Sequence, residues 1–126
     1  MILRKLEKLK NFAGYLGAGV FTPDGDMVGG VTEVSGINFE IAGSLFHDAY
    51  LVTNNNTREA GFGYTNMIQV DTDMGIIFAK CIREEGLHFH TILVVKNDAN
   101  IAMAKLMLSR VVDSLREDFQ EPDENS

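Results

Sequence analysis

The sequence is poor in cysteine, proline and tryptophan: its 126 residues include one Cys, two Pro and no Trp. A single Cys excludes an internal disulfide framework and indicates a reducing, intracellular setting. Long hydrophobic runs are also missing, since no stretch reaches the roughly 18 apolar residues of a membrane span. Residues 1–10 alternate Leu with Lys and contain no signal-peptide core. We therefore expect a cytoplasmic protein without membrane insertion.

Positive charge is scarce as well. The chain has 11 Lys and Arg against 18 Asp and Glu, for a net charge of −7, and such a domain repels phosphate backbones, which predicts no nucleic-acid partner. Four cations are concentrated at the start of the chain: Arg4, Lys5, Lys8 and Lys10. They could contact an acidic partner or a membrane surface, but the simpler interpretation is the solvated face of an amphipathic helix.

The overall composition is that of one globular domain. Hydrophobic residues make up 45% of the chain and charged residues 23%, which excludes a wholly disordered or coiled-coil protein. Residues 117–126 carry five acids and no base. We expect one domain over residues 1–118 and an acidic disordered tail over 119–126.

Hydrophobic periodicity and turn residues predict the order of the elements. We expect, in chain order, a helix over 2–13, a hairpin over 15–34 turned by Pro23-Asp24-Gly25-Asp26, a helix over 38–57, strands at 64–71, 75–82 and 89–95, and a last helix after 97–100. Asn38 can cap the second helix, and Asn97 to Asn100 the third. Short connections make the three later strands an antiparallel meander.

The apolar patterns also predict which strands are central. Strands 75–82 and 89–95 are apolar almost throughout, so both faces should be covered, whereas strand 64–71 alternates and fits a sheet edge. Four side chains of the central strands should be nearly inaccessible: Ile77, Phe78, Leu93 and Val94. The expected fold is a three-layer α/β/α sandwich of the α+β type.

The second helix has two apolar stripes. We assign the stripe of Phe39, Ala42, Phe46 and Tyr50 to the sheet, which leaves Ile41, Leu45 and Val52 for another covering, such as a second subunit. The hairpin carries glycines at 17, 19, 29 and 30. Close approach of a helix or a second backbone explains them better than a ligand cradle.

A search for chemistry finds no catalytic constellation. His88 and His90 are two weak metal-ligand candidates on one strand face, but no acid or thiol pattern nearby completes a site, so we interpret them as a packed or surface pair. Cys81 is interpreted as a small hydrophobic residue packed within an apolar strand. Four aspartates that could suggest calcium ligands or a carboxylate pair are interpreted as ordinary turn residues: Asp24, Asp26, Asp71 and Asp73. The sequence predicts a binding protein, not an enzyme, with no cofactor and no metal.

Element order and three local segments carry a resemblance to a known family. The segments are the hairpin Gly19–Val28, the helix start Ile41–Leu45, and the strand Val94–Val95 that runs through Asp98 into the last helix. Over about residues 2–116 the chain resembles a prokaryotic member of the roadblock (dynein light-chain) family. The dense hairpin glycines and the polar end of the second helix, residues 54–57, depart from the family pattern.

The resemblance implies a five-stranded antiparallel sheet with the second helix on one face and the first and last helices on the other. It also implies a homo- or heterodimer, formed by edge pairing of the first meander strand and side-by-side packing of the second helix. Bacterial and archaeal relatives commonly partner a small Ras-like GTPase, which keeps its own catalytic groups. The expected contact residues are Ile41, Leu45, Val52, Thr65, Met67 and Gln69. The alternative function is a small-ligand or metal-binding sensor that uses the histidines and the glycine-rich hairpin.

Overall fold

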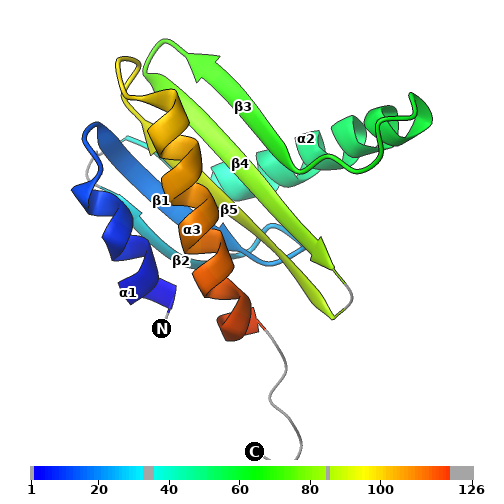
Figure 1. Ribbon diagram of the computed structural model, residues 1–126, viewed down its shortest axis with the longest axis horizontal. Coiled ribbons are helices and arrows are strands. Elements are labelled where there is room, and N and C mark those ends of the chain that lie inside the picture. The colour runs from blue at the N-terminus through cyan, green and yellow to red at the C-terminus, as the bar shows by residue number, and fades with distance from the viewer. Residues whose placement is uncertain (1, 33–35, 85, 120–126) are drawn as a thin grey trace, which may run out of the picture.

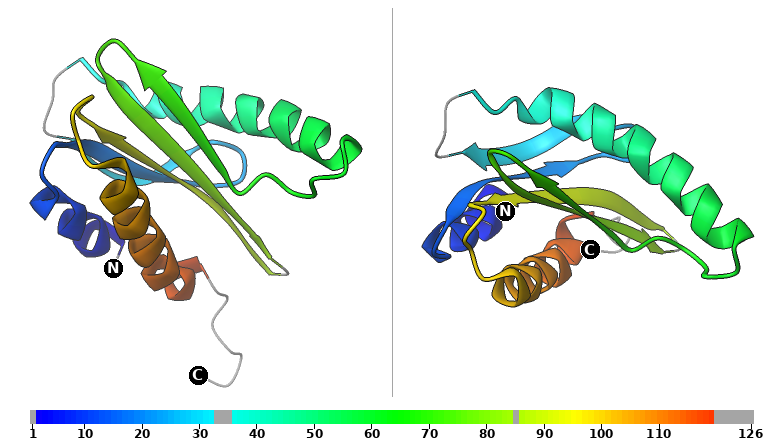
Figure 2. Two further views of the ribbon diagram at one scale, coloured as in Figure 1. Left: turned by 45° about the horizontal axis from the view of Figure 1, so that its top comes forward. Right: turned by 90° about the horizontal axis from the view of Figure 1, so that it is seen from above.

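A computed structural model describes residues 2–32, 36–84 and 86–119. These residues form a five-stranded sheet of order β2-β1-β5-β4-β3, in which every neighbouring pair is antiparallel. The elements are α1 (Ile2–Glu7), the 3₁₀ helix η1 (Lys8–Asn11), β1 (Tyr15–Phe21), β2 (Met27–Thr32), α2 (Phe39–Glu59), β3 (Met67–Thr72), β4 (Gly75–Glu84), β5 (Leu87–Val95) and α3 (Ile101–Phe119). Helix α2 covers one face of the sheet, and α1 and α3 cover the other (Figures 1 and 2). The expected α/β/α sandwich is confirmed.

Strand β5 is the centre of the sheet, paired with β1 on one side and β4 on the other. Strand β3 is an edge, as the alternation of 64–71 predicts, although its ladder begins only at Met67. Strand β2 is the other edge, and its residues are exposed or half-buried throughout. The chain therefore presents two sheet edges.

The core is divided by the sheet into two clusters. The larger one lies under α1 and α3 and includes Phe78, Phe89 and Leu93, while the smaller one lies under α2 around Phe21 and Ile92. Phe78 and Leu93 are fully buried and Val94 is nearly so, as expected.

Ile77 does not follow that expectation, because it is only half-buried. Its side chain lines an apolar cavity between α2 and the β3 side of the sheet. A helix packed on a twisted sheet does not cover every residue of the face beneath it, and sequence periodicity carries no information on where the covering ends.

Two glycines allow α2 to approach β1 closely. A Cβ added at Gly17 would lie 2.6 Å from the ring of Phe39, and one at Gly43 would lie 2.3 Å from the ring of Phe21. The interpretation of the hairpin glycines as sites of close helix approach is confirmed at Gly17. The turn residue Gly25 has a φ of 93°, as the Pro-Asp-Gly-Asp turn requires.

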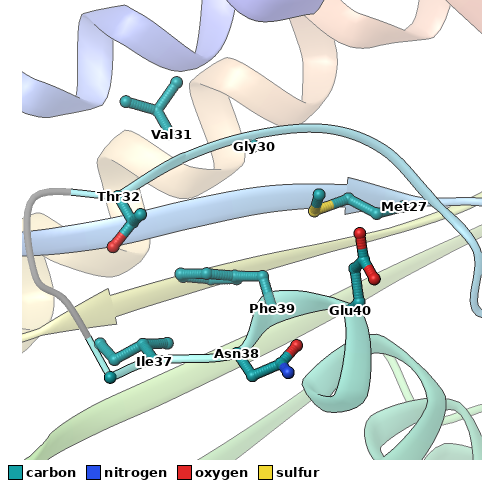
Figure 3. A pocket seen from close by; sticks show the side chains of 9 residues that line it. Met27, Gly30, Val31, Thr32, Ile37, Asn38, Phe39 and Glu40 are labelled. Atoms are coloured by element: carbon teal, nitrogen blue, oxygen red, sulfur yellow. The ribbon is translucent and has the colours of Figure 1, made fainter.

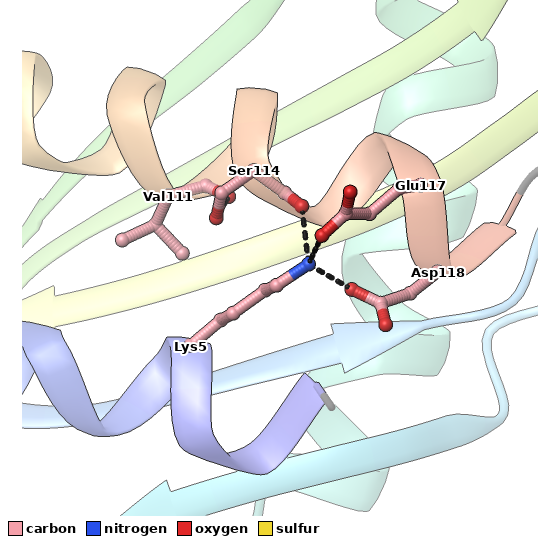
Figure 4. Close-up of polar contacts among 5 residues, drawn as sticks. All are labelled: Lys5, Val111, Ser114, Glu117 and Asp118. Carbon is pink, nitrogen blue, oxygen red and sulfur yellow. Dashed lines mark hydrogen bonds and ion pairs between the residues drawn. The ribbon is translucent and has the colours of Figure 1, made fainter.

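The first helix is shorter than its apolar periodicity predicts. The α-helix ends at Glu7, and the chain continues as η1, with Leu6 and Leu9 fully buried against the sheet. Lys5 is not part of a solvated face. Its Nζ donates to the Ser114 carbonyl at 2.6 Å and pairs with Asp118 at 2.8 Å and with Glu117 (Figure 4). Lys5 turns away from solvent because the acids at the end of α3, Glu117 and Asp118, offer it partners.

The last helix begins where its cap predicts and extends to Phe119. The Asn100 side chain accepts a hydrogen bond from the Met103 N–H at 3.0 Å. At the other end the Phe119 ring stacks on Phe89 with ring centroids 4.3 Å apart. The rest of the expected acidic tail, residues 120–126, lies outside the described residues. No helix within the described part combines the length and apolar character needed to cross a bilayer.

Candidate functional site

Helix α2 presents an apolar stripe to solvent. Ile41, Leu45 and Val52 are 56%, 61% and 62% exposed, and their spacing places them on one side of the helix. The opposite side packs on the sheet: Phe39 and Tyr50 are buried, and Ala42 and Phe46 are half-buried against the smaller core. The assignment of the Phe39, Ala42, Phe46 and Tyr50 stripe to the sheet is confirmed. The helix begins at Asn38, whose side chain accepts a hydrogen bond from the Ile41 N–H at 3.1 Å.

The three predicted contact residues around β3 do not join this stripe through their side chains. Met67 packs against the core under α1 and α3, and Gln69 lies opposite the buried Phe78, so both side chains face away from α2. Ile68 and Val70 face α2, because they pair with Ala79 and Ile77 of the smaller core. Met67 and Gln69 therefore contribute to the edge by their backbones.

The alternation of residues 64–71 predicts Thr65 as a strand residue on the same face as Met67 and Gln69, and the structure differs. Thr65 is buried and precedes β3; its N–H donates to the Asn54 side chain at 2.9 Å, and its hydroxyl lies 2.9 Å from the Thr57 hydroxyl. The polar end of α2 is thus a clamp that holds the loop between α2 and β3. The sequence signal for this clamp is the run of polar residues at 54–57, which departs from the family pattern.

Between α2 and the β3 side of the sheet lies an apolar cavity of about 140 Å³. Phe46 lines it from the helix, Ile77 lines it from the sheet, and the highly exposed Met74 lines it from the turn between β3 and β4. Sequence reasoning missed this cavity because the gap depends on how the helix crosses the sheet.

A second cavity, of about 570 Å³, lies at the opposite edge of the sheet. Figure 3 shows that its lining comes from β2, including Met27 and Thr32, and from the segment that starts α2, including Phe39 and Glu40. Its walls mix apolar side chains with one carboxylate and backbone groups. This arrangement forms an open groove and contains no nucleophile with an adjacent base.

The histidines lie under α2 near the β4–β5 hairpin. Cys81 on β4 is directly opposite His90 on β5, and ligand atoms of Cys81, His88 and His90 all lie within 4.8 Å of one another. The sequence interpretation, that no acid or thiol pattern nearby completes a site, did not include Cys81, because the hairpin register that brings it beside the histidines cannot be read from sequence spacing. The ring of His47, from α2, lies 5.7 Å from that of His90, centroid to centroid.

Burial controls the protonation of this cluster. It lowers the pKa of His90 to about 4, with a further contribution from the neighbouring His88, and it also lowers the pKa of His88. Burial raises the pKa of the Cys81 thiol and raises the pKa of Tyr50 to about 12. The Tyr50 ring lies 5.4 Å from the His90 ring, centroid to centroid. At neutral pH these four side chains are therefore uncharged.

No protein-family model matches the sequence, and no curated protein matches it. Solved structures share its fold. MglB of Myxococcus xanthus has a TM-score of 0.81 at 12% identity, with 94% of each chain covered. An MglB with a tetrameric arrangement has a TM-score of 0.77 at 15% identity, covering 92% of this chain and 85% of the other. A roadblock/LC7 domain of Streptomyces avermitilis has a TM-score of 0.76 at 14% identity, with 92% of each chain covered. The protein therefore has the fold of the bacterial roadblock/LC7 proteins.

Proposed function

We propose that the protein is a non-enzymatic dimeric adaptor that binds and regulates a small Ras-like GTPase. The observation that carries the proposal is the exposed apolar stripe of α2, Ile41, Leu45 and Val52, in a chain whose β3 edge has no partner strand among the described residues. Bacterial and archaeal roadblock proteins, which the sequence resembles and whose fold it shares, dimerise through these two elements and commonly partner such a GTPase.

The backbone of β3 supports pairing with a second copy. The Cys81 N–H donates to the Asn66 carbonyl, and these residues lie opposite each other in the β3–β4 register. In an antiparallel ladder the bonded residues alternate, so the backbone N–H and C=O groups of Met67 and Gln69 point away from β4. The strand carries no Lys, Arg or Pro that would protect this edge. A second copy related by a two-fold axis would satisfy these groups.

The helix stripe supports the same assembly. The stripe consists of three large apolar side chains on one helix face. A partner that removes them from water stabilises the complex by roughly 25 cal/mol per Å² of apolar surface buried. In a two-fold dimer the stripe would pack against its own copy. Regulation would then act by positioning: the dimer binds the GTPase, and the GTPase supplies the catalytic groups.

Replacing Leu45 by Asp tests the assembly. We expect the wild-type chain to sediment as a dimer at micromolar concentration and the Leu45→Asp chain as a monomer, because the interface would bury an unpaired charge. Leu51→Asp is the matched control, since Leu51 is also exposed but lies about 120° around the helix from Leu45. The control should remain dimeric. A wild-type chain that sediments as a monomer would remove the assembly from the proposal.

The GTPase requires a separate experiment. The untagged protein, coupled to a resin, is used to capture partners from its native lysate, and any GTPase recovered is purified and assayed for GTP hydrolysis with and without the adaptor. We expect a Ras-like GTPase whose hydrolysis rate changes when the adaptor is added. Recovery of no GTPase, by a chain shown to be dimeric, would contradict the regulatory function while leaving the dimer intact.

A further inference from the structure

The histidines and the cysteine of this protein gather at one place. The whole chain has three His and one Cys. His88 and His90 lie on β5, and Cys81 lies on the neighbouring β4. The His47 ring comes from α2 and lies 5.7 Å from the His90 ring, centroid to centroid. A hairpin and a helix distant from it in the sequence thus bring these four side chains together, on the face of the sheet that α2 covers.

The spacing of the donor atoms is close to that of a metal site. Ligands of a tetrahedral Zn²⁺ ion lie about 3.3–3.6 Å apart, given bonds of about 2.0 Å to nitrogen and 2.3 Å to sulfur. The donor atoms of Cys81, His88 and His90 lie within 4.8 Å of one another with no ion present. Small rotations of the histidine rings are enough to close the remaining gap, and His88 is only half-buried, so its ring has room to move.

Three ring nitrogens at this place have no hydrogen-bond partner. The Nε2 atoms of His88 and His90 and the Nδ1 atom of His47 are buried and unpaired among the described residues. Buried polar atoms in native proteins are nearly always satisfied, and an orphan points to a missing ion or water. His90 is also the most enclosed of the three, at 9% exposed.

We infer that Cys81, His88 and His90, with His47 as the fourth donor, form a binding site for Zn²⁺ or a divalent ion of similar preference. Thiolate and imidazole together suit Zn²⁺, whereas Ca²⁺ and Mg²⁺ take oxygen ligands.

The surrounding charges are mixed. Arg83 acts on the cluster as a cation, and Asp24 in the β1–β2 turn acts on His88 as an anion. On binding, the Cys81 thiol loses its proton to solvent and forms the sulfur–metal bond, so the thiolate offsets one of the two positive charges of the ion. The bound ion would join α2 to the β4–β5 hairpin. This site does not depend on the proposed GTPase partner.

Titration with Co²⁺, a spectroscopic substitute for Zn²⁺, tests the site. The untagged full chain is treated with a chelator, dialysed and titrated with Co²⁺. We expect one ion per chain, a thiolate-to-metal charge-transfer band and the visible bands of a tetrahedral centre, all removed when Zn²⁺ displaces Co²⁺. Zn²⁺ should also raise the Tm of the wild-type chain, because an ion that binds only the folded state stabilises it. No binding, or binding without a charge-transfer band, would overturn the site.

Three variants identify the ligands. Cys81→Ser, His88→Ala and His47→Gln should each weaken Zn²⁺ binding by at least about a hundredfold, the upper end of the loss that follows removal of an outer-shell partner. The control is Asp71→Asn, which removes an exposed carboxylate on β3 and should leave the affinity unchanged. Circular dichroism verifies the fold of each variant. Since His88 and His47 are both half-buried, their variants keep the test decisive if Cys81→Ser unfolds. Folded variants that bind Zn²⁺ as tightly as the wild type would overturn the inference.

Discussion

At the scale of single residues, Phe78 shows how burial converts to stability. Its side chain is fully buried in the larger core, so Phe78→Ala should lower the free energy of unfolding by about 3–5 kcal/mol through lost transfer energy and the cavity left behind. Urea unfolding followed by circular dichroism gives the value. Phe62→Ala is the matched control, because Phe62 is 84% exposed and its loss should change stability by less than about 0.5 kcal/mol. Equal losses would mean that Phe78 is not in the core.

Gly43 is a second residue whose size is fixed by its neighbours. A Cβ there would lie 2.3 Å from the Phe21 ring and 2.9 Å from the Gly25 carbonyl oxygen. The better helix propensity of Ala, worth about 1 kcal/mol, is therefore outweighed by overpacking. We expect Gly43→Ala to lower the free energy of unfolding by about 1–2 kcal/mol, measured by the same unfolding experiment. Ser44→Ala, at the exposed next position, should be nearly neutral, and a stabilised Gly43→Ala chain would show that α2 can move away from β1.

The residues that sequence reasoning placed correctly are those whose environment is local or periodic. Phe78 and Leu93 follow from strands that are apolar throughout, and the caps Asn38 and Asn100 follow from residue type at a helix start. Ile77 lies in an equally apolar strand yet is half-buried. The path of α2 over the sheet decides that difference, and no pattern within the strand records it.

At the scale of elements, the contact between α1 and α3 should respond to pH. The Lys5 ammonium, hydrogen-bonded to Asp118, holds the pKa of that carboxyl below its ordinary value of 3.8. A carboxyl whose pKa is depressed by folding stabilises the folded state above its ordinary pKa, and this contribution is lost as the pH falls through the folded value. The loss should therefore occur below about pH 4.

Asp118→Asn removes this contribution while keeping the shape of the side chain. We expect the free energy of unfolding of the wild type to fall more steeply than that of Asp118→Asn as the pH is lowered below about 4, measured by urea unfolding at each pH. Glu117→Gln is the comparison, since the Glu117 side chain is 75% exposed and should contribute less. Identical slopes for the wild type and Asp118→Asn would show that the ion pair does not couple the two helices.

The order and type of the elements were predictable from the sequence, but the contacts between side chains of different elements were less so. Each helix and strand has a hydrophobic period or a turn signal of its own, which predicts the sandwich and the β3 edge. The meeting of Cys81 with His90 depends on the register of the β4–β5 hairpin, and the burial of Thr65 depends on a side-chain clamp from Asn54. Both are relations between segments, so sequence reasoning found only the His88 and His90 pair of the candidate metal site and missed the clamp.

At the scale of the whole molecule, the two faces of the sheet differ in how they are covered. Helices α1 and α3 close one face over the larger core, whereas α2 alone covers the other (Figure 2). An apolar cavity lies beside α2 on this second face. The exposed α2 stripe, the cavity and the histidine cluster all belong to this second face or its helix. A partner that contacts α2 would thus act on the less completely packed half of the protein.

The strand order also governs how the chain can fold. The pairing of β1 with β5 joins Ala18 to Leu93, which are 75 positions apart in the sequence, whereas the β1–β2 hairpin and the β3–β4–β5 meander join neighbouring segments. Loop closure costs more entropy as the loop grows, and non-local pairing slows folding. The seam through the middle of the sheet is therefore its most non-local contact. The β1–β2 hairpin and the β3–β4–β5 meander can each form first, and the larger core is complete only when β1 pairs with β5.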